Sequence, residues 1–168
     1  LMGLHDTETM NCIRNELVKI KPDVLIYGEG WKMYNAGKMI SADQTNAQKM
    51  PNIGLFNDAV RCGIKGPVFD DKQNGFIQDG SRREAVKFGI TGAVKHDQVK
   101  YAEVEGTAAP NPWSLKTWVS VNYTEIHDNM TCYDKLFMTM QNKPEKYLDH
   151  MQKMALSLLL LSEGYPIL

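Results

Sequence analysis

The sequence has almost no excess of charge of either sign. Nineteen lysine and arginine residues stand against twenty aspartate and glutamate residues, so the net charge at pH 7 is −1. No cluster of basic residues stands out, and we therefore expect neither nucleic acid nor an anionic membrane surface as a partner. Hydrophobic residues make up 43% of the sequence and charged residues 23%, which excludes a disordered or fibrous chain.

Long hydrophobic runs and cysteines are also scarce. The longest mostly apolar run, Met154–Leu161, has eight residues. A bilayer span needs about 20, so we expect no membrane insertion. The sequence has three cysteines, Cys12, Cys62 and Cys132. Their wide spacing provides no pair of metal ligands, and their odd number weakly favours a reducing compartment. No secretory signal is visible at the start of the sequence.

Both ends of the sequence are apolar. The 168 residues have about the size of one domain, yet the chain starts with Leu1–Leu4 and stops at Tyr165–Leu168. Natural termini are usually polar and loosely ordered. We therefore expect the natural protein to be longer than this chain.

Helices and strands are expected to alternate along the chain. Met10, Ile13 and Leu17 share one helical face, which predicts a helix from Asp6, its N-cap, to Lys21. Apolar runs without polar alternation predict buried strands at 24–27, 53–56, 118–126 and 165–168. Further helices are predicted at 58–64, 81–88, 129–140 and 144–161, and a loop at 95–112. The apolar stripe of the last helix is expected to be Tyr147, Met151, Met154, Leu158 and Leu161.

This alternation is typical of a parallel α/β fold, either a doubly wound sheet or a (β/α)8 barrel. In a barrel the C-terminal strand ends meet on one face and supply the catalytic residues. Three predicted strands end in polar residues, namely Glu29, 57–58 and His127–Asn129. Glu29 and the His127–Asp128 pair would then meet over one pocket, which supplies the separate titratable groups that acid/base chemistry needs.

Each of these residues also has a structural interpretation. Glu29 lies between two glycines and fits a solvated loop, and Trp31 fits either the core or a platform for stacking sugars. Asp128 fits the N-cap of the following helix, as Asp6 does for the first one. The coincidence of polar groups on successive strand ends favours a functional site over these separate interpretations.

At these residues the sequence resembles the type I pullulanases, which belong to the α-amylase family of glycoside hydrolases. The similarity covers essentially the whole chain. It is carried by 1–6, 8–10, 27–31, Asp58, Arg61, 63–66, 68–70, 121–123, 127–131, 134–136 and 164–168. It implies that residues 1–168 form the C-terminal half of a catalytic (β/α)8 TIM barrel, from about strand five to the start of strand eight. The remainder of the barrel and the accessory domains would lie outside this chain and act as its partners.

The resemblance implies cleavage of α-1,6 branch linkages in pullulan, starch or glycogen-type α-glucans with retention of configuration. Glu29 would be the general acid/base, and Asp128 would stabilise the transition state. His127, Trp31 and Asn129 would bind the sugar. The reaction requires no cofactor, although structural calcium is common in the family. Such enzymes occur in the bacterial cytoplasm, in secreted form or at the cell surface, so the resemblance leaves the localisation open.

One catalytic group of the family is expected to be missing. The nucleophile is an aspartate immediately before the segment that matches Leu1–Leu4, so this chain is expected to lack it and to be inactive alone. Retaining cleavage needs a protonated acid beside the leaving oxygen and an ionised nucleophile about 5–5.5 Å away. The pKa of Glu29 is therefore expected to be raised.

Other functions remain open from the sequence alone. A metal-dependent hydrolase would use two histidine–aspartate pairs, at 5–6 and 127–128, although their spacing gives no helical ligand pair. A non-catalytic α-glucan-binding module would stack sugars on Trp31, Trp113 and Trp118. Isoamylase-like and glycogen-debranching enzymes are alternatives within the same family.

Overall fold

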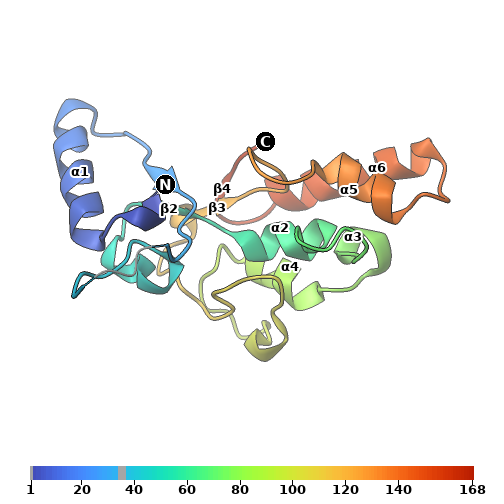
Figure 1. Cartoon of the computed structure of the whole chain (residues 1–168), viewed down its shortest axis with the longest axis horizontal. Coiled ribbons are helices and arrows are strands. Elements are labelled where there is room, and N and C mark those ends of the chain that lie inside the picture. The colour runs from blue at the N-terminus through green and yellow to red at the C-terminus, as the bar shows by residue number, and fades with distance from the viewer. Residues whose placement is uncertain (1, 34–36) are drawn as a thin grey trace.

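The chain forms a four-stranded parallel sheet with helices packed beside it (Figure 1). The computed structural model describes residues 2–33 and 37–168, so Leu1, the first residue of the expected family motif, lies outside the described residues. The strands are β1 (Tyr27–Gly28), β2 (Gly54–Phe56), β3 (Ser120–Asn122) and β4 (Tyr165–Pro166). Every pair of neighbours is parallel, which confirms the predicted parallel α/β fold.

The strand order β1-β2-β3-β4 follows the order along the chain. Gly28 pairs with Leu55, and Phe56 pairs with Val121, so the C-terminal ends of the first three strands lie along one edge of the sheet. A doubly wound sheet reverses its strand order at the ligand-binding crevice. No reversal occurs among the strands of the described residues.

Within the described residues, one α-helix precedes β1, three α-helices connect β2 to β3, and two connect β3 to β4. Their bounds are α1 (Thr7–Ile20), α2 (Asp58–Lys65), α3 (Phe76–Asp79), α4 (Arg83–Ile90), α5 (Cys132–Thr139) and α6 (Glu145–Leu160). The predicted helices are confirmed, and their ends differ from the predicted ones by no more than three residues. The sequence did not predict α3, because four residues are too few to show a helical period. The predicted loop at 95–112 contains one short 3₁₀ turn, Tyr101–Glu103.

The first helix begins where the sequence predicts. Asp6 is its N-cap and accepts a 2.8 Å hydrogen bond from the backbone N–H of Thr9. Of its apolar face, Met10 is buried, whereas Leu17 and Ile20 are exposed. Figure 1 shows α1 at one end of the molecule, apart from the group formed by α2 to α6. The amphipathic pattern therefore predicts the helix correctly, but within the described residues only the Met10 end of its apolar face is covered.

The predicted apolar stripe of α6 is largely wrong. Tyr147 and Leu161 are exposed, and the buried positions are Leu148, Met151, Ala155 and Leu159. The end of this helix carries four consecutive apolar residues, Leu158–Leu161, so periodicity does not single out one face. The face is set by packing, because α6 lies against α3 and α5.

The strands are shorter than the sequence predicts. Of the first predicted strand, 24–27, only Tyr27 joins the sheet, together with Gly28. Among the strands of the described residues, this strand pairs only with β2. The third predicted strand contributes Ser120–Asn122, because Thr117–Val119 forms a 3₁₀ turn before it and the chain leaves the sheet after it. The residues that leave the sheet carry the His127–Asn129 segment.

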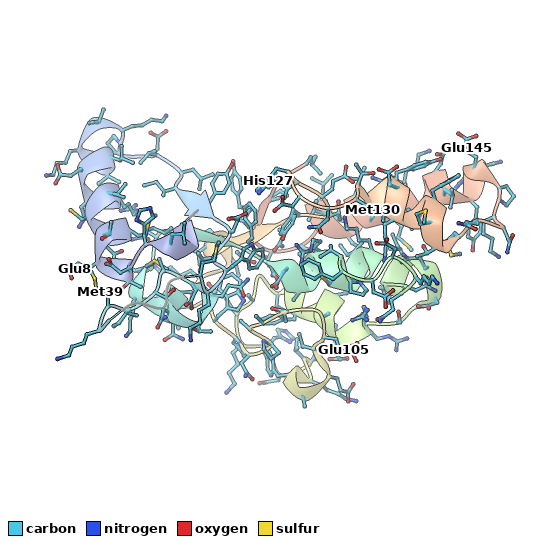
Figure 2. The ribbon with its side chains drawn as sticks, viewed as in Figure 1. Glu8, Met39, Glu105, His127, Met130 and Glu145 are labelled. Carbon is cyan, nitrogen blue, oxygen red and sulfur yellow. The ribbon has the colours of Figure 1, made fainter. Side chains whose placement is uncertain are left out.

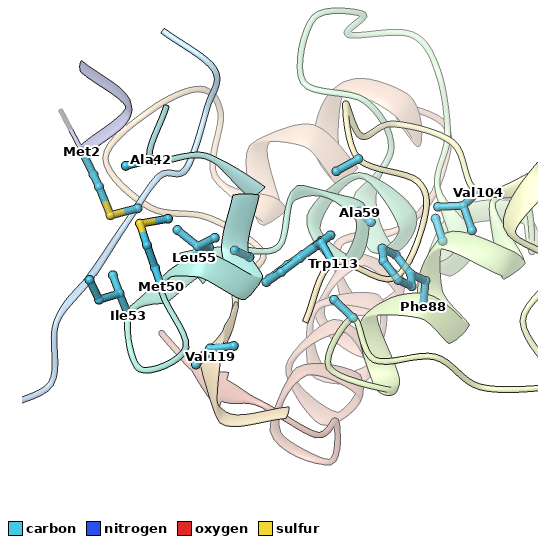
Figure 3. Close-up of a cluster of buried hydrophobic side chains, with 14 of the residues drawn as sticks. Met2, Ala42, Met50, Ile53, Leu55, Ala59, Phe88, Val104, Trp113 and Val119 are labelled. Atoms are coloured by element: carbon cyan, nitrogen blue, oxygen red, sulfur yellow. The ribbon is translucent and has the colours of Figure 1, made fainter. Parts of the chain in front are cut away.

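Buried apolar side chains gather in three clusters. The largest includes Met50, Leu55, Phe88 and Trp113 (Figure 3). A second cluster lies between α2, α5 and α6. The smallest consists of Phe56, Val121 and Tyr123 at the C-terminal ends of β2 and β3, and Trp31 packs against it. This smallest cluster therefore underlies the edge at which the predicted site residues emerge. Among the described residues, no helix is both long and apolar enough to span a bilayer.

Candidate functional site

The C-terminal ends of β1, β2 and β3 open onto a cavity of about 570 Å³. Its lining includes all five predicted site residues, which are Glu29, Trp31, His127, Asp128 and Asn129. The first two follow β1 and the other three follow β3, and 98 residues separate Glu29 from His127. The fold therefore brings the two predicted groups together, as the strand-end argument requires.

The polar centre of the site consists of Glu29, His127 and Asp128. His127 Nε2 lies 3.1 Å from Glu29 Oε1 and 3.5 Å from Asp128 Oδ2. The Glu29 side chain is 18% exposed, whereas that of Asp128 is 66% exposed. Two carboxyl groups in different environments thus lie beside one imidazole ring, which is the kind of arrangement that separates acid and base roles.

The pKa of Glu29 lies below its ordinary value. Burial raises this pKa, but the hydrogen bonds and positive charges of His127 and of this chain's amino terminus together lower it by more. The raised pKa is expected of the complete enzyme, whereas within this chain the pKa is lowered. The partners of Glu29 stabilise its ionised form, and a raised pKa needs a further negative charge beside it.

Aromatic side chains form the floor of the cavity. The Phe56 ring lies edge-on to Trp31, with ring centroids 6.4 Å apart, and its centroid is 4.9 Å from that of Tyr123. Arg61 Nη1 donates a 2.9 Å hydrogen bond to the Tyr123 hydroxyl, and its Cζ lies 5.9 Å from the centre of the Trp31 ring. Trp31 therefore packs on the smallest core cluster and also lines the cavity. Its position fits both the interpretation as a core residue and the interpretation as a surface for sugar.

The cavity contains a buried carboxyl group, that of Asp58, for which no catalytic role was predicted. Asp58 follows β2, and its Oδ1 accepts hydrogen bonds from Thr107 Oγ1 at 2.8 Å and from Gln44 Nε2 at 3.1 Å. Burial raises the pKa of Asp58 and outweighs these hydrogen bonds and the charge of Arg61. Its position directly after a predicted strand was the signal that could have placed it here. Gln44 begins a 3₁₀ turn and Thr107 lies in an irregular segment, and neither directly follows a predicted strand.

Replacing Asp58 by asparagine tests its environment. Because its pKa is raised in the folded state, the stability that Asp58 contributes below its unfolded pKa is lost as the pH rises through its folded pKa. Asparagine carries no charge and keeps an acceptor for Gln44 and Thr107. We expect the melting temperature of Asp58→Asn, relative to the parent protein, to increase between about pH 4 and about pH 8. Calorimetry measures the melting temperatures of both proteins across this pH range. Asp149→Asn, at an exposed position, is the control. A melting temperature of Asp58→Asn that falls relative to the parent over this range would contradict the prediction.

The loop that carries His127–Asn129 ends in a helix cap of its own. Thr131 is the N-cap of α5, and its Oγ1 accepts a 3.1 Å hydrogen bond from the Asp134 backbone N–H. The interpretation of Asp128 as the cap of this helix is therefore wrong. Asn129 has a φ of 67°, in the left-handed region that asparagine tolerates better than most residues. This turn keeps the side chains of the site on a loop, ahead of the helix.

A metal ion could contact the same polar centre. The possible ligand atoms of Glu29, His127 and Asp128 all lie within 4.8 Å of one another. The grouping predicted for a metal-dependent hydrolase does not occur among the described residues, because neither His5 nor Asp6 belongs to a potential metal cluster there. Asp6 is buried and bonds to Thr9 as the cap of α1.

The tryptophans do not form one stacking surface. Trp113 is buried in the largest core cluster, so its predicted role as a sugar platform is wrong. Trp118 is exposed, and the Lys116 ammonium lies 4.8 Å from the centre of its ring. Of the three tryptophans, Trp31 is the one that lines the cavity.

Comparison with known proteins gives consistent similarities along the whole chain, although no protein-family model matches it. A curated pullulanase of Bacillus subtilis is 32% identical over 170 residues, which cover all of this chain and 22% of that protein. The structure of pullulanase type I from Bacillus subtilis complexed with maltose matches 99% of this chain at 31% identity, with a TM-score of 0.87. Pullulanase from Anoxybacillus sp. LM18-11 complexed with maltotriose matches 99% at 34% identity, with a TM-score of 0.84. This chain spans 22% of each of these proteins.

Proposed function

This chain matches pullulanases along its whole length in sequence and in structure, and from that premise we propose that it forms part of the catalytic domain of an α-glucan debranching hydrolase. The proposed reaction is hydrolysis of α-1,6-glucosidic branch linkages in pullulan, starch or glycogen-type α-glucans. One observation carries the proposal. Glu29 and the His127–Asp128 pair, from two different strand ends, meet within hydrogen-bonding distance over one cavity.

We assign the chain to the C-terminal half of a (β/α)8 barrel, from about strand five to the start of strand eight. Parallel strands whose spatial order follows the sequence support this assignment, because each barrel strand lies beside its neighbours in the chain. The matched relatives are four to five times longer than the part that this chain covers. In this proposal the remaining barrel strands belong to the rest of the natural protein.

The proposed roles follow the chemistry of the side chains. Glu29, the more buried carboxyl, is the general acid/base that protonates the leaving glycosidic oxygen and then activates water. Asp128 stabilises the transition state by accepting hydrogen bonds from sugar hydroxyls. His127 and Asn129 also bind the sugar, and the Trp31 ring lines the path of the substrate. None of these steps requires a metal ion or a cofactor, and calcium would serve only as a structural ion.

The nucleophile of the proposed retaining reaction comes from a part of the protein that lies outside these residues. It would be a carboxylate about 5–5.5 Å from Glu29. Its negative charge would raise the pKa of Glu29, since like charges disfavour ionisation. The lowered pKa in this chain and the raised pKa that catalysis needs are therefore compatible, and the chain alone is proposed to be inactive.

The full-length protein tests the proposal through its products. Pullulan consists of maltotriose units joined by α-1,6 bonds, so we expect maltotriose as the end product, released first as the α-anomer. Chromatography identifies the sugar, and proton NMR during the first turnovers identifies the anomer.

Release of glucose or maltose from linear α-1,4 chains, with pullulan left intact, would contradict the debranching reaction. A β-anomer as the first product would contradict retention. Hydrolysis of glycogen but not of pullulan would favour the isoamylase-like alternative, and binding without hydrolysis would favour a non-catalytic module.

A further inference from the structure

Two buried lysine side chains bond to segments that line or adjoin the cavity. Lys65, the last residue of α2, is 1% exposed, and Lys135 of α5 is 2% exposed. Lysine is almost never buried to this degree unless its ammonium group is paired. Burial lowers the pKa of both lysines, so their charged forms depend on the groups that surround them. Both ammonium groups donate hydrogen bonds to backbone carbonyls.

The partner of Lys65 lies at the end of the segment that carries the site. Lys65 Nζ donates a 2.6 Å hydrogen bond to the carbonyl oxygen of Met130. Met130 directly follows His127–Asn129 and directly precedes Thr131, the N-cap of α5. The side chains of His127 and Asp128 are 57% and 66% exposed, so their own burial does not hold them in place. The Lys65 contact ties their loop to the buried end of α2.

The partners of Lys135 lie in the loop on another side of the cavity. Its Nζ donates to the carbonyl oxygens of Pro67, at 3.1 Å, and of Asp70. This loop follows α2, and Pro67–Phe69 line the cavity. Phe69 is 94% exposed, so the loop is not held by packing of its largest side chain.

The two contacts are reciprocal. A lysine of α2 holds the loop that leads into α5, and a lysine of α5 holds the loop that leaves α2. The two helices pack against each other, which fixes the distance between the two ammonium groups and the loops that they hold. A charged donor gives a stronger hydrogen bond than a neutral one, and low solvent exposure strengthens it further.

We propose that Lys65 and Lys135 are positioning residues that hold two walls of the cavity in register, Lys65 for the His127–Asp128 segment and Lys135 for the Pro67–Asp70 loop. This inference rests on the proposed function for its kinetic consequences. Lys65 contacts Met130, which lies three residues after His127 and two after Asp128 in the chain. Loss of the Lys65 contact is therefore expected to displace groups at the reacting bond. Lys135 acts on a loop that supplies none of the proposed catalytic carboxylates, so its loss weakens substrate binding.

The test compares Lys65→Met and Lys135→Met in the full-length protein, with Lys153→Met on the exposed face of α6 as the matched control. Methionine approximates the length of the lysine stem and removes the donor. We expect Lys65→Met to lower kcat on pullulan by about tenfold or more with little change in KM, because small misplacements of reacting groups are costly. Lys135→Met is expected to raise KM by severalfold with a smaller change in kcat. Lys65→Arg, which retains charge and donors, is expected to recover part of the lost kcat.

Hydrogen exchange gives a readout that does not depend on activity. Backbone amides of 125–131 are expected to exchange faster in Lys65→Met, and those of 68–72 faster in Lys135→Met, with the rest of the protein unchanged. If the full-length protein degrades no α-glucan, the proposed function fails, and this measurement still decides the positioning role.

Several outcomes would overturn the inference. Unchanged kcat and unchanged exchange in a folded Lys65→Met protein would do so, as would equal kinetic effects of the two substitutions. If Lys65→Met does not fold, replacing the peptide bond between Met130 and Thr131 by an ester weakens the acceptor and leaves Lys65 in place. Parent-like kcat and parent-like exchange of 125–131 in the ester protein would then reject the role of this contact.

Discussion

Glu29→Gln in the full-length protein is expected to lower kcat on pullulan by about 10²–10⁴-fold and to leave substrate binding close to that of the parent. Glutamine keeps the size of the side chain and a hydrogen-bonding partner for His127 Nε2, now 3.1 Å from Glu29 Oε1. It supplies no proton to the glycosidic oxygen. The sugar oxygen of pullulan is a poor leaving group without that proton, so the loss falls on the chemical step.

Substrates that do not need the proton separate this role from a general loss of structure. Fluoride is a good leaving group that departs from α-maltosyl fluoride without being protonated. We therefore expect Glu29→Gln to hydrolyse this substrate at a rate much nearer to that of the parent. Added azide is expected to restore turnover, because it attacks the intermediate without a general base. Glu145→Gln, at the far end of α6 in Figure 2, is the matched control with parent-like activity. Equal losses on pullulan and on the fluoride would assign Glu29 a structural role.

Asp128→Asn is expected to lower kcat by about 10²–10³-fold, the usual cost of removing one group that stabilises a transition state electrostatically. The Asp128 side chain is 66% exposed and does not cap α5, so its replacement is expected to leave the melting temperature nearly unchanged. Initial rates and calorimetry on the same preparation measure the two quantities. Unlike Glu29→Gln, this variant is expected to lose activity on the activated fluoride as well, because the same transition state forms there.

Asp97→Asn is the control for the loss of one aspartate charge, since Asp97 is exposed in the loop at 95–112. It is expected to keep the parent kcat. A fall in the melting temperature of Asp128→Asn large enough to account for its lost activity would contradict a role in the transition state. Retention of the parent kcat by Asp128→Asn would contradict it directly.

The sequence was most informative where one local rule acts on a few residues. Asp6 was predicted as the N-cap of α1 and is the cap, because a short acceptor before a helical period satisfies a free backbone N–H. The prediction for α6 failed because its apolar residues surround much of the helix, and only contact with α3 and α5 selects the buried face. Asp128 satisfied the cap rule equally well, but a left-handed turn at Asn129 follows it, and the N-cap of α5 is Thr131.

By itself the sequence determined the order of the helices and strands, the parallel α/β class and the residues that follow each strand. These features depend on apolar periodicity and on residue types at the ends of elements, which are local properties of the chain. Only the tertiary structure decided which of these residues meet. It placed His127 against Glu29, left Trp118 on the surface, buried Trp113 and the two lysines, and put Asp58 in the wall of the cavity. Such contacts join residues far apart in the chain, and burial and hydrogen bonding there depend on the assembled fold.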